Sequence, residues 1–259
     1  MRRKPLAPLG SSPLPDQSPS SPIKRGKERK NYESNHSSKT DKSSISHWAH
    51  AKLPRDPACP ECSRGCPAAG RRVSGFQHRG GDNALFSLTT GTGNTALGWR
   101  SLSVDTEGSF NTGVGGGALA LNTGSSNTAV GAAALLLNTI GSDNTAVGTD
   151  AMVFNDTGID NTATGAFALF SNTEGNLNTA DGFRALYLNT SGDRNTASGV
   201  GALSSTTEGN DNTAVGVNAL LFNISGDNNT ALGRSAGLDI NGSGNVCIGT
   251  GSPRRGWCR

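Results

Sequence analysis

Large apolar and aromatic side chains are scarce in this sequence. Its 259 residues include 8 Phe, 3 Trp and 2 Tyr, so aromatic residues make up only 5% of the chain. No stretch approaches the roughly 18 consecutive apolar residues that a membrane-spanning helix requires. Residues 2–4 are basic, but Pro and Ser interrupt the segment that follows, and no signal peptide is visible. We therefore expect no membrane span.

Residues that usually carry catalysis are scarce as well. The 4 His residues, His36, His47, His50 and His78, lie outside the repeat array described below. Acidic residues of the array occupy varied turn positions, as solubilising charges do, and the Gly-Gly-x-Gly-x-Asp pattern of calcium-binding rolls is missing. Gly113-x-Gly115 belongs to one divergent repeat and is a weak match to a phosphate-binding loop. The sequence predicts no enzyme, no catalytic residues, no cofactor and no metal site.

Cysteine is present in an odd number, with no regular disulfide framework. Cys59-x2-Cys62-x3-Cys66 follows His47 and His50, and these residue types could bind zinc. A single cluster without a matching second pair is a weak signal, so we interpret these three cysteines as incidental. Cys247 stands in an Ala position of the repeat and is expected to be a small buried residue.

The motif Asn-Thr-Ala-x-Gly returns about every 17 residues and accounts for most of the chain. Numbering each repeat from this Asn as position 0 places Thr at position 1, Ala at 2 and 7, Gly at 4 and 14, Leu at 8 and a second Asn at 11 in most copies. So regular a spacing indicates units that stack on their neighbours. The Asn residues at position 0 are Asn94, Asn111, Asn127, Asn144, Asn161, Asn178, Asn195, Asn212, Asn229 and Asn245.

The repeat is too short for a helix pair, which takes more than about 30 residues, and two Gly per unit disfavour long helices. We interpret Asn-Thr-Ala-x-Gly as one very short strand and Ala-Leu-x-x-Asn-Thr as a second. Thr would point outward and Ala and Leu inward, because side chains alternate along a strand. Stacked Asn side chains would form hydrogen-bonded ladders. The sequence thus predicts an all-β fold, a parallel β-solenoid over residues 81–251 with about 17 residues per coil.

The charge changes sharply near residue 80. Residues 1–80 contain 16 Lys and Arg against 6 Asp and Glu, a net of +10, whereas residues 81–259 contain 7 against 14, a net of −7. The Ser- and Pro-rich segment 1–80 has too little apolar surface to fold alone, so we expect it to be disordered. Its basic run lacks interleaved aromatic residues, and no nucleic-acid partner is expected. Residues 252–259 break the repeat and are expected to form an irregular tail.

The unit Asn-Thr-Ala-Val-Gly-x-x-Ala-Leu-x-x-Asn-Thr-x-Gly resembles the head repeats of YadA-type trimeric autotransporter adhesins. It is also similar to repeats of some phage tail-fibre and bacterial surface proteins. The resemblance covers roughly residues 81–251. It implies a left-handed β-roll, assembly as a homotrimer, a cell-surface or extracellular location, and a host-matrix, glycan or cell-surface ligand.

Apolar residues at consecutive positions 8, 9 and 10 cannot all face one interior if the segment is a strand. We therefore expect a self-association stripe, with a wide, irregular monomer core as the alternative. Neither end of the array shows a recognisable cap. The expected function is that of a non-enzymatic structural or adhesive surface rod with a multivalent face. The alternatives are an ice- or ordered-surface-binding solenoid that uses the Thr column, or a truncated fragment of a larger adhesin or tail fibre. The stripe comprises Leu136, Val153, Phe170, Tyr187 and Leu221.

Overall fold

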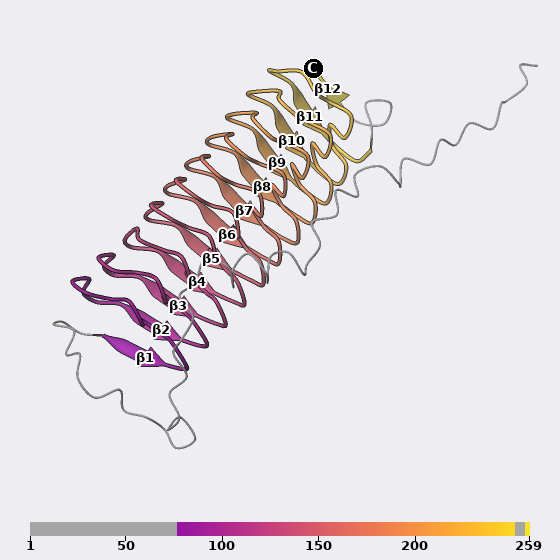
Figure 1. The fold of residues 1–259 in the computed structure, drawn as a ribbon. Coiled ribbons are helices and arrows are strands. Elements are labelled where there is room, and N and C mark those ends of the chain that lie inside the picture. The colour runs from indigo at the N-terminus through magenta and orange to yellow at the C-terminus, as the bar shows by residue number, and fades with distance from the viewer. Residues whose placement is uncertain (1–76, 252–256) are drawn as a thin grey trace, which may run out of the picture. The chain divides into compact units, whose positions relative to one another are not determined.

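The computed structural model describes residues 77–251 and 257–259. Within them every regular element is a strand, and the strands form one sheet in chain order. Strands β1 to β11 are parallel, and Figure 1 shows them stacked one behind another. The predicted parallel β-solenoid is confirmed, while its left-handed turn stays a prediction. The strands are β1 (His78–Gly80), β2 (Thr95–Leu97), β3 (Thr112–Val114), β4 (Thr128–Val130), β5 (Thr145–Val147), β6 (Thr162–Thr164), β7 (Thr179–Asp181), β8 (Thr196–Ser198), β9 (Thr213–Val215), β10 (Thr230–Leu232), β11 (Val246–Ile248) and β12 (Trp257–Cys258).

The predictions for the amino-terminal segment concern residues that lie almost wholly outside the described part of the chain. These predictions are its disorder, its basic run and the cysteine cluster Cys59, Cys62 and Cys66. The described chain enters the sheet at His78, which pairs with Thr95, slightly before the expected start at residue 81. Gln77 takes the place of the repeat Asn: its side chain accepts from Asn94 N at 3.1 Å and donates to Gly91 O at 2.7 Å.

The inward and outward sides of each strand are as the alternation predicts. In β6, Ala163 is fully buried, whereas Thr162 is exposed. Ala163 pairs in register with Ala146 and Ala180 on the neighbouring strands, and both are equally buried. The core is therefore a column of Ala side chains that packs against the Leu column from position 8.

The expected second strand of each coil is wrong. The residue at position 8 has φ between 49 and 53° in nine coils, as at Leu169 (φ 50) and Met152 (φ 50), so the chain turns there. A left-handed conformation costs Leu roughly 1–2 kcal/mol. Burial of its side chain offsets that cost, and so does a hydrogen bond from Leu169 N to Ala185 O of the next coil at 3.0 Å.

This turn also corrects the expected stripe at position 9. Leu136, Val153 and Phe170 are buried within the single chain, with exposures of 6%, 0% and 7%, while Tyr187 and Leu221 are half-buried. The prediction assumed strict alternation, which a left-handed residue at position 8 breaks. The wide, irregular core thus describes position 9 better. Apolar residues that stay accessible lie one position further, as at Leu188 and Phe222, which are 36% and 50% exposed.

The predicted Asn ladders are present at both positions. At position 0, Asn161 donates from N and Nδ2 to Asn144 Oδ1, at 3.0 and 3.1 Å, and from Nδ2 to Gly175 O at 2.8 Å. At position 11, Asn155 Nδ2 donates to Asn138 Oδ1 at 2.6 Å. These side chains are fully buried, so each amide must find its partners inside the stack, and the ladders supply them.

One coil breaks the second ladder. Thr206 occupies position 11 there, and its hydroxyl donates to Asn223 O at 2.7 Å. Asn189 Oδ1, which would accept from an amide at that place, is buried without a hydrogen-bond partner. We expect Thr206→Asn to raise the free energy of unfolding by about 1 kcal/mol, because it satisfies this oxygen. Thermal unfolding of this variant measures the gain, and Thr207→Asn, a substitution of the neighbouring half-buried residue, is the control. Equal or lower stability of Thr206→Asn would contradict it.

Asp105 holds position 11 in the first full repeat and is buried. Burial raises its pKa, although hydrogen bonds from Gly108 N (2.8 Å) and Asn111 Nδ2 (3.2 Å) act in the opposite direction. The folded state therefore holds a proton more tightly than the unfolded state. The stability that protonated Asp105 contributes is fully present below the ordinary Asp pKa of about 3.9. It is lost as the pH rises through the pKa of Asp105 in the folded state.

We expect Asp105→Asn, which restores the repeat residue, to stabilise the protein at neutral pH by about 1 kcal/mol. The difference from the parent chain should shrink as the pH falls toward 4. Denaturant unfolding across this range tests both statements, with the exposed Asp160→Asn as control. If the parent chain instead became more stable relative to Asp105→Asn between pH 4 and 7, the raised pKa of Asp105 would be contradicted.

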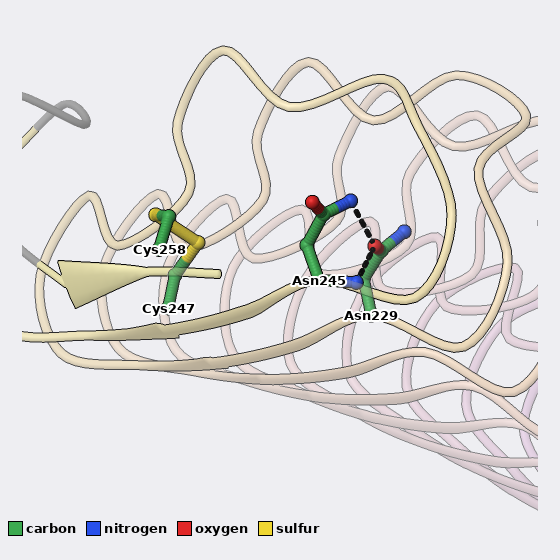
Figure 2. Close-up of a disulfide and its surroundings, with 4 residues drawn as sticks. All are labelled: Asn229, Asn245, Cys247 and Cys258. Carbon is green, nitrogen blue, oxygen red and sulfur yellow. Dashed lines mark hydrogen bonds between the residues drawn. A yellow bond between two sulfur atoms is a disulfide. The ribbon is translucent and has the colours of Figure 1, made fainter.

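The carboxyl-terminal end of the stack differs from the sequence interpretation in two ways: the sheet has a cap there, and Cys247 is paired with another cysteine. Strand β12 returns to pair antiparallel with β11, so this edge of the sheet is covered. Cys247 is buried as expected, but it does more than fill an Ala position, because it forms a disulfide with Cys258 of β12 (Figure 2). Figure 2 also shows Asn245 of the final coil bonded to Asn229 Oδ1, from N and from Nδ2 at 2.9 Å each. The end of the stack is thus fixed by a disulfide and by the ladder.

Candidate binding face

The outer side of the strand sheet presents two columns of side chains in register. We define the sheet face as the side chains at positions 1 and 3 of β2 to β11. Position 1 is Thr in every strand from β2 to β10, with equivalent Thr residues paired directly, as Thr179 with Thr196. All of these Thr side chains are exposed or half-buried. Neighbouring coils lie about 4.8 Å apart, so the hydroxyls form a regular row.

Position 3 gives the sheet face an apolar column. Seven of its ten residues are Leu, Val or Ile, and the side chains of Leu97, Val147 and Ile248 are 46%, 40% and 54% exposed. Scattered exposed apolar residues need no explanation, but aligned runs of them, here β2 to β5 and β9 to β11, mark an interaction surface. The sequence interpretation considered Thr alone and missed this column. The same alternation that placed Ala inward would have found it.

The sheet face carries almost no charge. Asp181 is its only ionisable residue from β2 to β11, and Thr164 donates a hydroxyl hydrogen bond to its carboxylate at 2.7 Å. Charges gather instead at turns, where Arg194 binds Asp211 through two nitrogens at 2.7 and 2.9 Å and lowers the pKa of that carboxyl. The arrangement suits contact with a regular, uncharged partner surface better than attraction of an ionic ligand.

The described residues contain no group of three or more His, Cys, Asp or Glu side chains placed to hold a metal ion. Nor do residues 77–251 and 257–259 contain a helix with the length and apolar character of a membrane span. Comparisons of the chain with protein-family models, with curated proteins and with solved structures return no match.

Proposed function

We propose that this protein is a non-enzymatic structural or adhesive surface protein that makes multivalent contacts through the sheet face. The observation that carries the proposal is the register of that face: the hydroxyl column continues over nine successive strands, β2 to β10, and the apolar column covers β2 to β5 and β9 to β11. A partner that presents a repeating surface can engage many equivalent positions at once, so weak single contacts add to firm attachment. The resemblance to YadA-type heads agrees with this use.

The disulfide supports a location at the cell surface or outside the cell. Cys247 and Cys258 are bonded, and structural disulfides form and persist in oxidising compartments. The buried Asn ladders also suit a protein that must keep its shape without a large apolar core, because every coil holds its neighbours through hydrogen bonds.

The test is attachment of the full chain to immobilised collagen, fibronectin and intact host cells. A variant with Val130→Lys, Val147→Lys and Val215→Lys places charges on the sheet face, at residues that are 38–40% exposed. Its matched control carries Ile140→Lys, Ile159→Lys and Ile224→Lys, which are 44–64% exposed and lie outside the strands. We expect the first variant to lose attachment and the control to keep it. No attachment by the parent chain, or equal loss in both variants, would count against the proposal.

The proposal includes assembly as a homotrimer, as the resemblance implies. With position 9 buried, the accessible apolar stripe at position 10 is the proposed contact, and it includes Leu188 and Phe222. Sedimentation of the full chain at micromolar concentration should give a trimer, and Phe222→Asp should shift it toward monomer. A monomeric parent chain would reject this part of the proposal.

Binding to ice or another ordered surface is a second candidate, favoured by the unbroken Thr row of β2 to β10. Only β6 carries Thr at both outward positions, Thr162 and Thr164, and in most other strands Thr lies beside Val or Leu. Thermal hysteresis of the purified chain distinguishes this candidate from adhesion.

A further inference from the structure

Five of the chain's aromatic residues lie together on three successive coils, although the chain is poor in such residues. The ring of Phe170 is central, with centroids of Phe154, Phe167 and Tyr187 at 5.1, 5.7 and 5.2 Å. Phe167 in turn lies 5.9 Å from Phe183. These are ordinary contact distances for aromatic pairs. We call these five residues and Arg184 the aromatic cluster.

The stacking of coils does not require this cluster. At the same repeat positions, other coils carry small residues such as Gly116, Gly117, Gly201 and Ser204. Their strands β3 and β8 keep the same parallel register as β6 and β7. A feature that the solenoid itself needed would return in each coil, as the Asn ladders do. Its confinement to three coils indicates a local role in binding.

The cluster presents flat rings and a cation to solvent. Phe170 is buried beneath its neighbours, whereas Phe183 is 44% exposed and Arg184 is exposed. Cζ of Arg184 lies 5.1 Å from the Tyr187 ring centroid and 5.2 Å from that of Phe183, which is the geometry of cation–π contacts. Ion pairs among the described residues involve Arg194 and not Arg184. The Arg184 guanidinium therefore keeps N–H donors for a ligand.

We propose that the aromatic cluster binds a neutral glycan built of pyranose rings, an inference that deepens the adhesive function proposed above and rests on it. The C–H face of a pyranose ring packs on the exposed ring of Phe183 and the half-buried ring of Tyr187, while its hydroxyl oxygens accept hydrogen bonds from Arg184. An apolar peptide would offer the guanidinium only its backbone carbonyls, whereas a pyranose ring offers several hydroxyl oxygens beside its C–H face. A polyanion would meet repulsion from residues 81–259, whose net charge is −7.

A second pair of the same kind occupies the same repeat positions five coils earlier. Trp99 and Arg100 stand at positions 5 and 6, as Phe183 and Arg184 do, and Arg100 Cζ lies 4.9 Å from the Trp99 ring centroid. Trp99 is 49% exposed. Five coils correspond to about 24 Å along the stack, so an extended glycan chain can contact both pairs.

The experiment titrates the full chain with cellohexaose, mannohexaose, chitohexaose and laminarihexaose, and with oligogalacturonate as an acidic probe, by calorimetry up to millimolar concentration. We expect at least one neutral hexasaccharide to bind, and Phe183→Ala to weaken that binding by about tenfold. Arg184→Gln should weaken it as well. Phe110→Ala is the matched control, because Phe110 is 68% exposed and lies outside the cluster, and it should leave the affinity unchanged.

The inference is overturned if none of the neutral hexasaccharides binds, if only oligogalacturonate binds, or if Phe183→Ala and Phe110→Ala behave alike. The sheet-face variant with three Lys substitutions separates this result from the proposed function. If Phe183→Ala loses glycan binding and the three Lys substitutions on the sheet face abolish surface attachment, both the glycan site and the adhesive function are supported. Surface attachment without glycan binding overturns the inference alone, and glycan binding by a chain that attaches to no surface counts against the adhesive function alone.

Discussion

Ala163→Asp is expected to lower the free energy of unfolding by at least about 3 kcal/mol, because it places a carboxylate in the core without a partner. Ala163 is fully buried in β6, and the fully buried Ala146 and Ala180 stand directly beside it in the column. The loss should be smaller at low pH, where the carboxyl group can be neutral. Thermal and denaturant unfolding of the full chain measure the effect.

The matched control for this substitution is Thr162→Ser, one residue earlier in the same strand. Thr162 points outward and is exposed, so its substitution should change stability by less than about 0.5 kcal/mol. Comparable melting temperatures for the two variants would show that the inward and outward assignments along β6 are wrong.

Gly165→Ala is expected to have an effect of similar size through the backbone. Gly165 has φ of +131°, a conformation that L side chains rarely adopt, and an added Cβ would lie 2.7 Å from the carbonyl carbon and oxygen of Gly182 in the next coil. These atoms belong to a hydrogen-bonded stack and cannot yield without shifting the coil. Conformational strain of roughly 1–3 kcal/mol and the steric overlap add together. We expect a total loss above about 3 kcal/mol, measured by denaturant unfolding.

Gly116→Ala tests whether the effect belongs to the position and not to any added methyl group. An added Cβ at Gly116 would meet nothing within 4 Å, and its φ is not positive. Stability should stay the same or rise slightly, since Ala restricts the unfolded chain more than Gly does. If Gly165→Ala proved as mild as Gly116→Ala, the close approach of successive coils at position 4 would be refuted.

The sequence by itself determined the stack and its inner and outer sides. A strict period of about 17 residues with Asn, Ala and Gly at fixed places is satisfied only when identical units lie in register. Alternation along a three-residue strand then places Ala163 inside and Thr162 outside, and buried Asn residues must pair with one another because water cannot reach them. These inferences need only local geometry and the repeat.

The tertiary structure alone decided the second half of each coil and its closed end. Local preference disfavours a left-handed Leu, so no sequence rule places Leu169 at a φ of 50°. Burial against the Ala column and a hydrogen bond to the next coil make that conformation the stable one, and they turn Phe170 from an expected outer residue into a buried one. Likewise, the sequence did not predict the pairing of Cys258, because its partner is defined by the return of β12 along β11, a contact that exists only once the stack has formed.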